Sequence, residues 1–496
     1  MKVTLSEVKK GYSGIKKLAF DEFKNANYEK CLEYVDHAAT LASQIMWRYS
    51  DDELEELLQE IGEKIIVKPE NYEADRKKIV FYDYFGSPVI LTLQYLRVLI
   101  QEGYEILYLY EERNNAKAPV VDIIKVYENV LIKKIALQSS RVSRIADIYR
   151  KIVEFKSSKI FLHINTLSVG IPAFSCLPKE IVRYYINLGD HAFWLGTKAI
   201  DYSFEFRSFG ANVSIQKRGL KKNQLLLLPY YPIIDKKDFK GFPKQCNNRV
   251  VIFSGGDFYK TVDKENTYWN LVNEILKTNP KAIIIYANKA LNSAGKNLLD
   301  SFIRTNNLED RFIPIGFRQD INEVMKNCDI YLGTCPMSGG LMSQHAAINA
   351  KPILQFYPHD LFSFEETESM ICYNEKIKIS FTNKEELLRE AKKLIENKDY
   401  RIERGVELQK CMITEEEFNN LFIKSITTHT TQVPIEDMTI KYNKIEQWWI
   451  EVNNEGYYDA GSFICSIIGK KSFIYIPRLI LLRYINNFLK KLKLYH

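Results

Sequence analysis

The sequence predicts an α/β protein built from two Rossmann-like domains that face a cleft, with a helical cap in front of them. Its length of 496 residues suggests two to four domains. Two blocks alternate buried-strand runs with helical stretches, and a Pro-, Gly- and Lys-containing stretch over 229–243 separates them. Such alternation is typical of parallel sheets with right-handed crossovers, which bind ligands at the carboxyl ends of their strands.

Composition is that of an ordinary globular chain. Hydrophobic residues make up 46% and charged residues 26%, which excludes disorder, collagen and coiled coil. Lys and Arg total 69 against 62 Asp and Glu, which gives a net charge of +7, and the bases in the body of the chain are spread out and not clustered. A nucleic-acid partner is therefore not expected. The 13% of aromatic residues favours large cores and ring-lined clefts without indicating a reaction.

Several signals of other protein classes are missing from the sequence. Residues 1–10 contain no apolar stretch of signal-peptide length, and no run of about 18 apolar residues follows. The eight cysteines include no Cys-x-x-Cys pair, and there is no Asp-x-Asp pair of the kind that clamps a metal-bound diphosphate. We expect a cytoplasmic protein without a bound metal or a cofactor.

Residues 1–76 are predicted to form the helical cap. Apolar residues recur at helical spacing over 13–66. Small and aromatic residues fall where one tetratricopeptide unit has them, namely at Ala19, Ala26–Tyr28, Cys31, Val35 and Ala38. Because such repeats normally occur in arrays, a plain helical hairpin packed on the next domain is an equal alternative.

The two α/β domains are predicted over 77–245 and 246–430, followed by an extension over 431–496. The first contains expected strands at 79–84, 105–110, 160–164 and 184–188, and a helix that ends near 101. The second alternates strands at 249–253, 282–286, 311–315, 329–332 and 352–356 with helices at 266–278, 293–306, 320–327 and 341–349.

Two loops of the second domain suit a phosphate. Gly255 and Gly256 follow a strand and precede Lys260, so the backbone can approach an anion that the lysine neutralises. A Gly-Gly turn without function is the alternative. The loop 333–340 ends where a helix begins, and the exposed N–H groups of a helix start form an anion site that suits a diphosphate. It has neither the Walker nor the dinucleotide spacing, so NAD is disfavoured.

The first domain offers candidates for proton transfer. Asp190 and His191 follow the strand at 184–188, where they could act as a base or bind a sugar hydroxyl. The alternative is a capped turn with Phe193 and Trp194 in the core. His163 and Asn165 end another strand and would face the same cleft.

Taken in order, these segments resemble the catalytic region of the O-linked N-acetylglucosamine transferases and of related bacterial glycosyltransferases that modify adhesins. The resemblance covers about residues 15–370 as scattered motifs: F-S-G-G-D-F-Y-K (253–260), 333–352, Phe85-Gly86-Ser87, His163-Ile164-Asn165 and 193–196. It implies the GT-B fold and a metal-independent, inverting hexosyl- or N-acetylhexosaminyltransferase that uses a nucleotide diphosphate-sugar, with a UDP-sugar favoured.

The resemblance also implies roles for individual residues. The donor would bind Gly255, Gly256, Lys260, Ser338, Gly339, Gly340, Leu341, Met342 and His345. Ser87, Asn165 and Trp194 would lie on the acceptor side, and Asp190 or His191, with His163 in reserve, would act as the base. The acceptor would be a glycan, a lipid-linked glycan or a protein in bacterial surface glycan or glycoprotein assembly.

The sequence departs from the family at the donor loop. The family's Gly-His-Thr-Thr core is replaced by residues 339–342, its ribose-binding Asp by His345, and its first-loop His by Ser87 and Pro88. Residues 339–342 keep the backbone N–H groups of the family's loop but lack the imidazole of its His and the hydroxyls of its two Thr residues. Two alternatives therefore stay open: a catalytically silent GT-B-like partner of a transferase, and a sugar-nucleotide epimerase. The lack of a Glu-x7-Glu pair near 333–352 favours inversion.

The C-terminal segment from about residue 470 is basic and amphipathic. It has no acidic residue, and Arg478, Arg483, Lys490, Lys491 and Lys493 alternate with large apolar residues. This pattern is typical of a helix at a membrane interface and predicts a peripheral position at the inner face of the membrane, which favours a lipid-linked acceptor. A terminal helix packed across the domains is the alternative.

Overall fold

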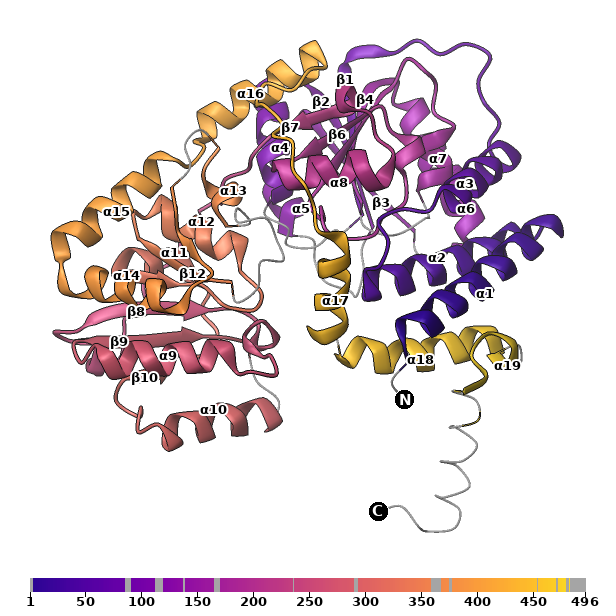
Figure 1. Cartoon of the computed structure of the whole chain (residues 1–496). Helices are drawn as coiled ribbons and strands as arrows, with labels where there is room; N and C mark the ends of the chain where they lie inside the picture. Colours follow the sequence, from indigo (N-terminus) through magenta and orange to yellow (C-terminus); the bar gives the residue numbers. More distant parts are fainter. Residues whose placement is uncertain are drawn as a thin grey trace. The chain divides into compact units, whose positions relative to one another are not determined.

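The computed structural model describes residues 3–84, 91–111, 119–136, 139–164, 170–234, 236–289, 293–357, 367–373, 377–452, 454–469, 472–478 and 481. The chain forms two compact units (Figure 1). The first unit combines Met1–Leu228 with Phe422–His496, and the second is Pro229–Leu421. Each is described by itself below.

The first unit is built on a parallel sheet. Over the described residues this sheet has seven strands in the order β3-β2-β1-β4-β5-β6-β7. Its central strands are continuous apolar runs, and Phe81 stacks between Tyr108 and Phe161 with ring centroids 6.2 Å from each. The strands are β1 (Asp75–Asp83), β2 (Glu105–Glu111), β3 (Val130–Ile135), β4 (Ser157–His163), β5 (Val182–Asn187), β6 (Tyr202–Glu205) and β7 (Leu225–Leu227).

Helices between these strands complete the α/β pattern. They are α4 (Leu91–Gln101), α5 (Pro119–Ile124), α6 (Arg141–Glu154), α7 (Ile171–Ser175) and α8 (Ser208–Arg218). Every strand pair recorded in this sheet is parallel, as the crossover helices require. The predicted Rossmann-like architecture of the first domain is thus confirmed.

The helical cap belongs to the core of the first unit. Its helices are α1 (Leu5–Lys24), α2 (Tyr28–Ile45) and α3 (Asp52–Ile65), and their apolar faces join the sheet in one hydrophobic cluster. Glu55 on α3 is buried and accepts hydrogen bonds from the backbone N–H groups of Gly196 and Thr197, at 2.6 and 3.1 Å. The predicted helices are confirmed, and their tetratricopeptide character stays a prediction.

The end of the chain returns to the first unit. Helix α16 (Glu415–Thr428) brings Phe422 against Tyr95, Phe161 and Phe204, with ring centroids 5.4–5.5 Å apart. Helices α17 (Tyr442–Val452), α18 (Asn454–Ile468) and α19 (Ser472–Tyr475) follow, and α18 packs on α1 and α2 (Figure 1). The first unit is therefore discontinuous in sequence, whereas the predicted domain boundaries are contiguous.

The second unit repeats the parallel α/β design. Its described residues form a six-stranded sheet in the order β10-β9-β8-β11-β12-β13. The strands are β8 (Val250–Gly255), β9 (Ala282–Ala287), β10 (Phe312–Pro314), β11 (Ile330–Leu332), β12 (Ile353–Phe356) and β13 (Ser380–Phe381). The helices are α9 (Thr267–Thr278), α10 (Ser293–Thr305), α11 (Ile321–Asn327), α12 (Gly340–Ile348), α13 (Glu368–Ile371), α14 (Lys384–Glu396) and α15 (Lys398–Lys410).

The segment 229–245 lies with the second unit, although its composition resembles a linker. The Tyr230 carbonyl accepts a hydrogen bond from Gln344 Nε2 at 3.0 Å, and Phe242 packs on the core beneath the sheet. These contacts explain why the second unit begins at Pro229. Among the described helices, none is both long enough and apolar enough to cross a bilayer.

Candidate functional site

Two loops of the second unit meet at the carboxyl ends of the neighbouring strands β8 and β11. Strand β8 leads into the short 3-10 helix η4 (Phe258–Thr261), which carries Lys260. The Lys260 ammonium donates a hydrogen bond to the Ser338 carbonyl at 3.4 Å, and the Met337 N–H donates to the Lys260 carbonyl at the same distance. The structure thus brings together the two phosphate-binding loops that the sequence predicts.

Helix α12 starts within this loop pair. Gly339 is its N-cap residue and has no side chain with which to cap the helix. The first N–H groups of a helix, here those of Gly340, Leu341 and Met342, have no acceptor within the helix and carry its positive dipole end. Together with the nearby Lys260 ammonium they form what we call the anion cradle, defined by Lys260 and residues 338–342.

Glycine occupies two crowded positions in the segments that lead from β8 and β11 into the cradle. A Cβ atom at Gly333 would lie 1.9 Å from Gln355 Oε1, and one at Gly255 would lie 2.5 Å from the Ala287 carbonyl oxygen. Gln355 Nε2 also donates to the Thr334 carbonyl at 2.9 Å, which fixes the loop between β11 and α12. The cradle is consequently a preformed backbone structure.

His345 lies on α12, beyond the cradle. The side chain is half-buried, and within the described part of the chain its Nδ1 atom is buried and has no hydrogen-bond partner. Burial lowers the pKa of His345 to about 4, so the imidazole is neutral at physiological pH. A neutral ring can donate or accept one hydrogen bond to a hydroxyl, whereas the family's carboxylate accepts two.

The first unit has a separate cavity at the ends of β4 and β5. Its volume is about 220 Å³. The two strands are neighbours in the parallel sheet, so their carboxyl ends lie at one edge, as predicted for His163 and the 188–196 loop. The cavity is lined mainly by His163, Tyr185, Leu188, Gly189, Phe193 and Trp194. Asn165 and Ser87 lie outside the described residues.

His163 is backed by a buried carboxylate. Its Nδ1 atom lies 2.9 Å from Thr92 Oγ1 and 3.3 Å from Asp83 Oδ1, while the Tyr108 hydroxyl donates to Asp83 Oδ2 at 2.6 Å. Asp83 and His163 are register partners at the ends of β1 and β4. A carboxylate behind an imidazole fixes the orientation of the ring. Sequence reasoning missed Asp83, although it lies inside an expected strand.

Asp190 is fully paired in the structure. Arg207 donates to it from Nε at 2.6 Å and from Nη2 at 3.2 Å, and His191 Nδ1 lies 3.0 Å from its other side. Burial pushes the pKa of Asp190 up, but Arg207 and His191 outweigh it and hold the pKa well below its usual range. Such a carboxylate is a weak base, and its contacts fix the loop. The His191 side chain remains 45% exposed.

The aromatic pair of the same loop lies in the core. Phe193 and Trp194 are 0% and 1% exposed, and the Trp194 ring stacks on Tyr185 with centroids 4.1 Å apart. The Arg218 guanidinium lies over the Trp194 ring and donates to the carbonyls of Asp190 and Ala192, at 2.8 Å each. These contacts agree with the core alternative for the two rings. An acceptor contact by Trp194 stays a prediction.

Two parallel α/β sheets, each in its own unit, define a two-domain Rossmann-like architecture with the GT-B fold. The structure of Anabaena HepE in complex with UDP and glucose is similar to this chain, with a TM-score of 0.51 and 15% identity over 71% of this chain and 99% of HepE. At this identity the likeness establishes the fold.

Two further solved structures are similar at lower scores. An O-GlcNAc transferase mutant from Thermobaculum terrenum has a TM-score of 0.47 and 12% identity, over 92% of this chain and 83% of its own. A UDP-N-acetylglucosamine 2-epimerase, described as putative, from Listeria monocytogenes has a TM-score of 0.49 and 14% identity, over 74% and 100%. No protein-family model and no curated protein sequence matches this chain.

Proposed function

We propose that this protein is a metal-independent, inverting glycosyltransferase that takes its sugar from a UDP-sugar. The observation that carries the proposal is the anion cradle, in which the Lys260 ammonium is held at the Ser338 carbonyl beside the start of α12. The HepE structure that establishes the fold was solved with UDP and glucose, which supports the same ligand class for this chain.

The cradle suits the departing diphosphate. When the bond between the sugar and UDP breaks, negative charge grows on the phosphate oxygen that leaves. A lysine and the first N–H groups of a helix stabilise that charge by preorganised electrostatics and without a metal ion. Residues 340–342 contribute backbone N–H groups to this task, so the family's missing imidazole and hydroxyls are not needed for it.

The Asp83–His163 pair is the base that the geometry favours. In an inverting transfer, the acceptor hydroxyl attacks the sugar carbon, its proton passes to the base, and UDP leaves from the opposite side. His163 lines the cavity of the first unit and has the Asp83 carboxylate at 3.3 Å to orient its ring. Asp190 is committed to Arg207, so of the adjacent pair only His191 keeps an exposed side chain for the role.

A thermal-shift titration with UDP, GDP, CMP and dTDP tests the proposal. We expect UDP to raise the melting temperature of the wild type and to lose this effect in Lys260→Ala, because a charge-assisted contact contributes about 1.5–3 kcal/mol. The matched control is Lys264→Ala, which removes an exposed lysine a few residues away. Equal UDP shifts in both variants would contradict the donor-site assignment.

The thermal-shift titration together with a turnover assay separates the alternatives. A catalytically silent partner, which the replacement of the family's loop residues at 339–342 would suit, gives no response to any of the four nucleotides. An epimerase binds UDP and converts the UDP-sugar without an acceptor. For a transferase, His163→Asn should keep the UDP-induced shift and lose UDP release from a UDP-sugar and acceptor, since the base acts only in turnover.

A further inference from the structure

The start of the C-terminal segment is anchored on α1. A Cβ atom at Gly14 would lie 2.9 Å from the Tyr475 ring, and one at Gly11 would lie 2.6 Å from Ile464, so the C-terminal helices lie directly on the α1 backbone. Ile476 is fully buried. Arg478 donates to both carboxylate oxygens of Glu7, from Nε at 2.8 Å and Nη2 at 2.7 Å. These contacts fix which side of the segment faces outward.

Large apolar side chains point away from this anchor. Ile474 is 76% exposed and Leu481 is 62% exposed, in contrast to the buried Ile476 between them. Leaving such side chains in water forgoes the free energy that their burial would release. The segment therefore presents an apolar surface beside its own anchoring residues.

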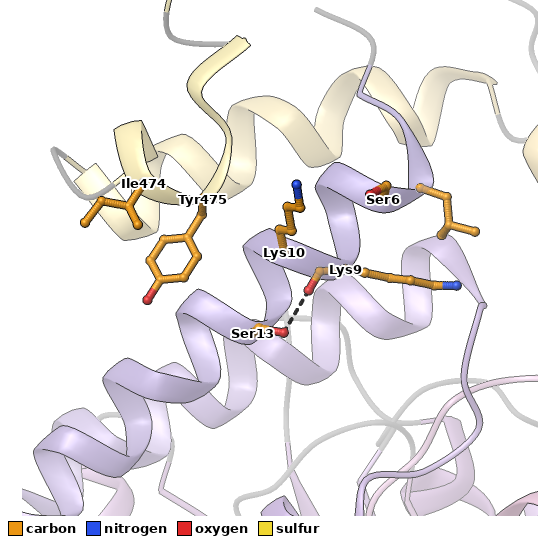
Figure 2. Close-up of a pocket in the computed structure, with 7 residues that line it drawn as sticks. Ser6, Lys9, Lys10, Ser13, Ile474 and Tyr475 are labelled. Atoms are coloured by element: carbon orange, nitrogen blue, oxygen red, sulfur yellow. Dashed lines mark hydrogen bonds between the residues drawn. The ribbon is translucent and has the colours of Figure 1, made fainter.

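Basic and hydroxyl groups lie next to these apolar side chains. An open groove of about 780 Å³ runs between α1 and α19 and is lined by Leu5, Ser6, Lys9, Lys10, Ser13, Ile474 and Tyr475. Figure 2 shows Lys10 extending from α1 into the space beside Tyr475, with Ser6 on the same helix. Lys9 reaches Glu446 at 3.4 Å, in a contact that is exposed on both sides and hence weak.

The sequence continues this character beyond the described residues. Between Gly469 and His496 there is no Asp or Glu, whereas Lys or Arg occurs at 470, 471, 478, 483, 490, 491 and 493. The two acids that reach this surface, Glu7 and Glu446, are paired with Arg478 and Lys9. The remaining basic groups, hydroxyls and large apolar side chains are complementary to anionic headgroups over acyl chains.

We infer that this face docks on a membrane surface rich in anionic phospholipids. The tail face is defined by Lys9, Lys10, Ile474 and Leu481, with Arg478 holding it on Glu7. Lys9 and Lys10 pair with headgroup phosphates in the groove, and Ile474 and Leu481 enter the interface between headgroups and acyl chains. The inference does not depend on the proposed transfer reaction, because no residue of the anion cradle takes part.

Co-sedimentation of the full chain with vesicles tests this inference. We expect binding to phosphatidylglycerol–phosphatidylcholine vesicles and little binding to phosphatidylcholine alone. Lys9→Ala/Lys10→Ala should weaken binding roughly 25-fold, since each base near an anionic surface contributes about 1 kcal/mol. Ile474→Glu/Leu481→Glu should weaken it by at least roughly tenfold. All four side chains are exposed or line an open groove, so the variants should fold.

Matched controls come from the second unit. Lys281→Ala/Lys398→Ala removes two exposed lysines, and Leu298→Glu/Ile402→Glu changes two apolar side chains that are 59% and 51% exposed. Both controls should bind vesicles like the wild type. Equal binding by the tail-face variants overturns the inference, as does equal binding to both vesicle types. Binding of glycerol phosphate without binding of vesicles also overturns the inference. So does a wild-type dimer that the tail-face variants abolish and the control variants keep.

Discussion

Buried polar and charged side chains beside the 188–196 loop are joined by hydrogen bonds. Glu205 is fully buried and accepts hydrogen bonds from Asn187 Nδ2 at 2.8 Å, Ser203 Oγ at 2.9 Å and Ser214 Oγ at 2.7 Å. Arg218, which holds the loop carbonyls, also donates to Ser214 Oγ at 3.1 Å. The loop that this group supports lines the cavity of the first unit.

The buried carboxyl of Glu205 should make stability depend on pH. Burial raises the pKa of Glu205 to about 7 although Arg218 lowers it, so the folded protein keeps a proton that the unfolded chain releases near pH 4.5. Its stabilising effect is complete below pH 4.5 and is lost as pH rises to 7, by at most about 3 kcal/mol. Glu205→Gln should remove this dependence, because the serine hydroxyls can turn to accept from the new amide.

Urea unfolding at pH 5.5 and pH 8 measures the effect. The wild type should lose more unfolding free energy than Glu205→Gln between pH 5.5 and pH 8. The difference in stability between the two proteins should therefore shift in favour of the variant at the higher pH. Glu56→Gln, which changes an exposed side chain on α3, should follow the wild type at both values. If the wild type and Glu205→Gln lose the same free energy between the two pH values, Glu205 does not titrate between them in the folded protein and the assignment is wrong.

For individual site residues, the sequence predicted the position in the fold better than the charged and hydrogen-bonded partners. The sequence placed Asp190 and His163 correctly at the ends of strands, because parallel strands bring their carboxyl ends to one edge. It did not reveal that Arg207 neutralises Asp190 or that Asp83 lies behind His163. Both facts depend on which strands are neighbours and which side chains turn inward, and neither is encoded in local spacing.

Strands buried on both faces were predicted well, and the strands that were missed are short or partly exposed. The five expected strands of the second domain correspond to β8–β12 within a few residues. Strand β3 was missed because Lys133 and Lys134 leave it half exposed at the edge of the sheet. Strands β6, β7 and β13 have only four, three and two residues, too few for a clear hydrophobic pattern.

The loop between β11 and α12 should tolerate no side chain at Gly333. A Cβ atom there would lie 1.9 Å from Gln355 Oε1, so Gly333→Ala must displace Gln355 and its hydrogen bond to Thr334. We expect a loss of about 1–3 kcal/mol in stability and a weaker UDP-induced shift in melting temperature. At Gly189 a Cβ atom would meet only an ordinary contact at 3.5 Å, so Gly189→Ala is the control. Equal UDP shifts in the two variants would show that the loop adapts.

The sequence did not predict that the first unit is made of two separate segments of the chain. The Pro-, Gly- and Lys-containing composition of 229–243 marks a connection between domains, but composition does not tell which domain a connection packs on. Likewise, the change of unit within α16 leaves no local signal, because the helix is continuous through it. What decides the division is a set of contacts with residues some two hundred positions earlier, such as those of Phe422 with Phe204.

Two phenylalanines of α16 should report on different units. Phe422 packs on Tyr95, Phe161 and Phe204 of the first unit, whereas Phe418 packs on Tyr231 of the second, and both are 0% exposed. Each change to alanine should cost about 3–5 kcal/mol. In hydrogen-exchange experiments, Phe422→Ala should lower protection in β4 and β6, and Phe418→Ala in the second unit. Loss of protection in the same unit from both variants would contradict this division.

The return of the chain to the first unit at Phe422 also affects the order in which the two units fold during translation. The second unit is one uninterrupted segment, but the first lacks the side chain that covers Phe161 and Phe204 until translation has passed residue 422. At 5–20 residues per second, the nascent first unit waits on the order of ten seconds or more with these rings uncovered. During that interval it is a natural client for chaperones, and the later part of the polypeptide completes its fold before the earlier part.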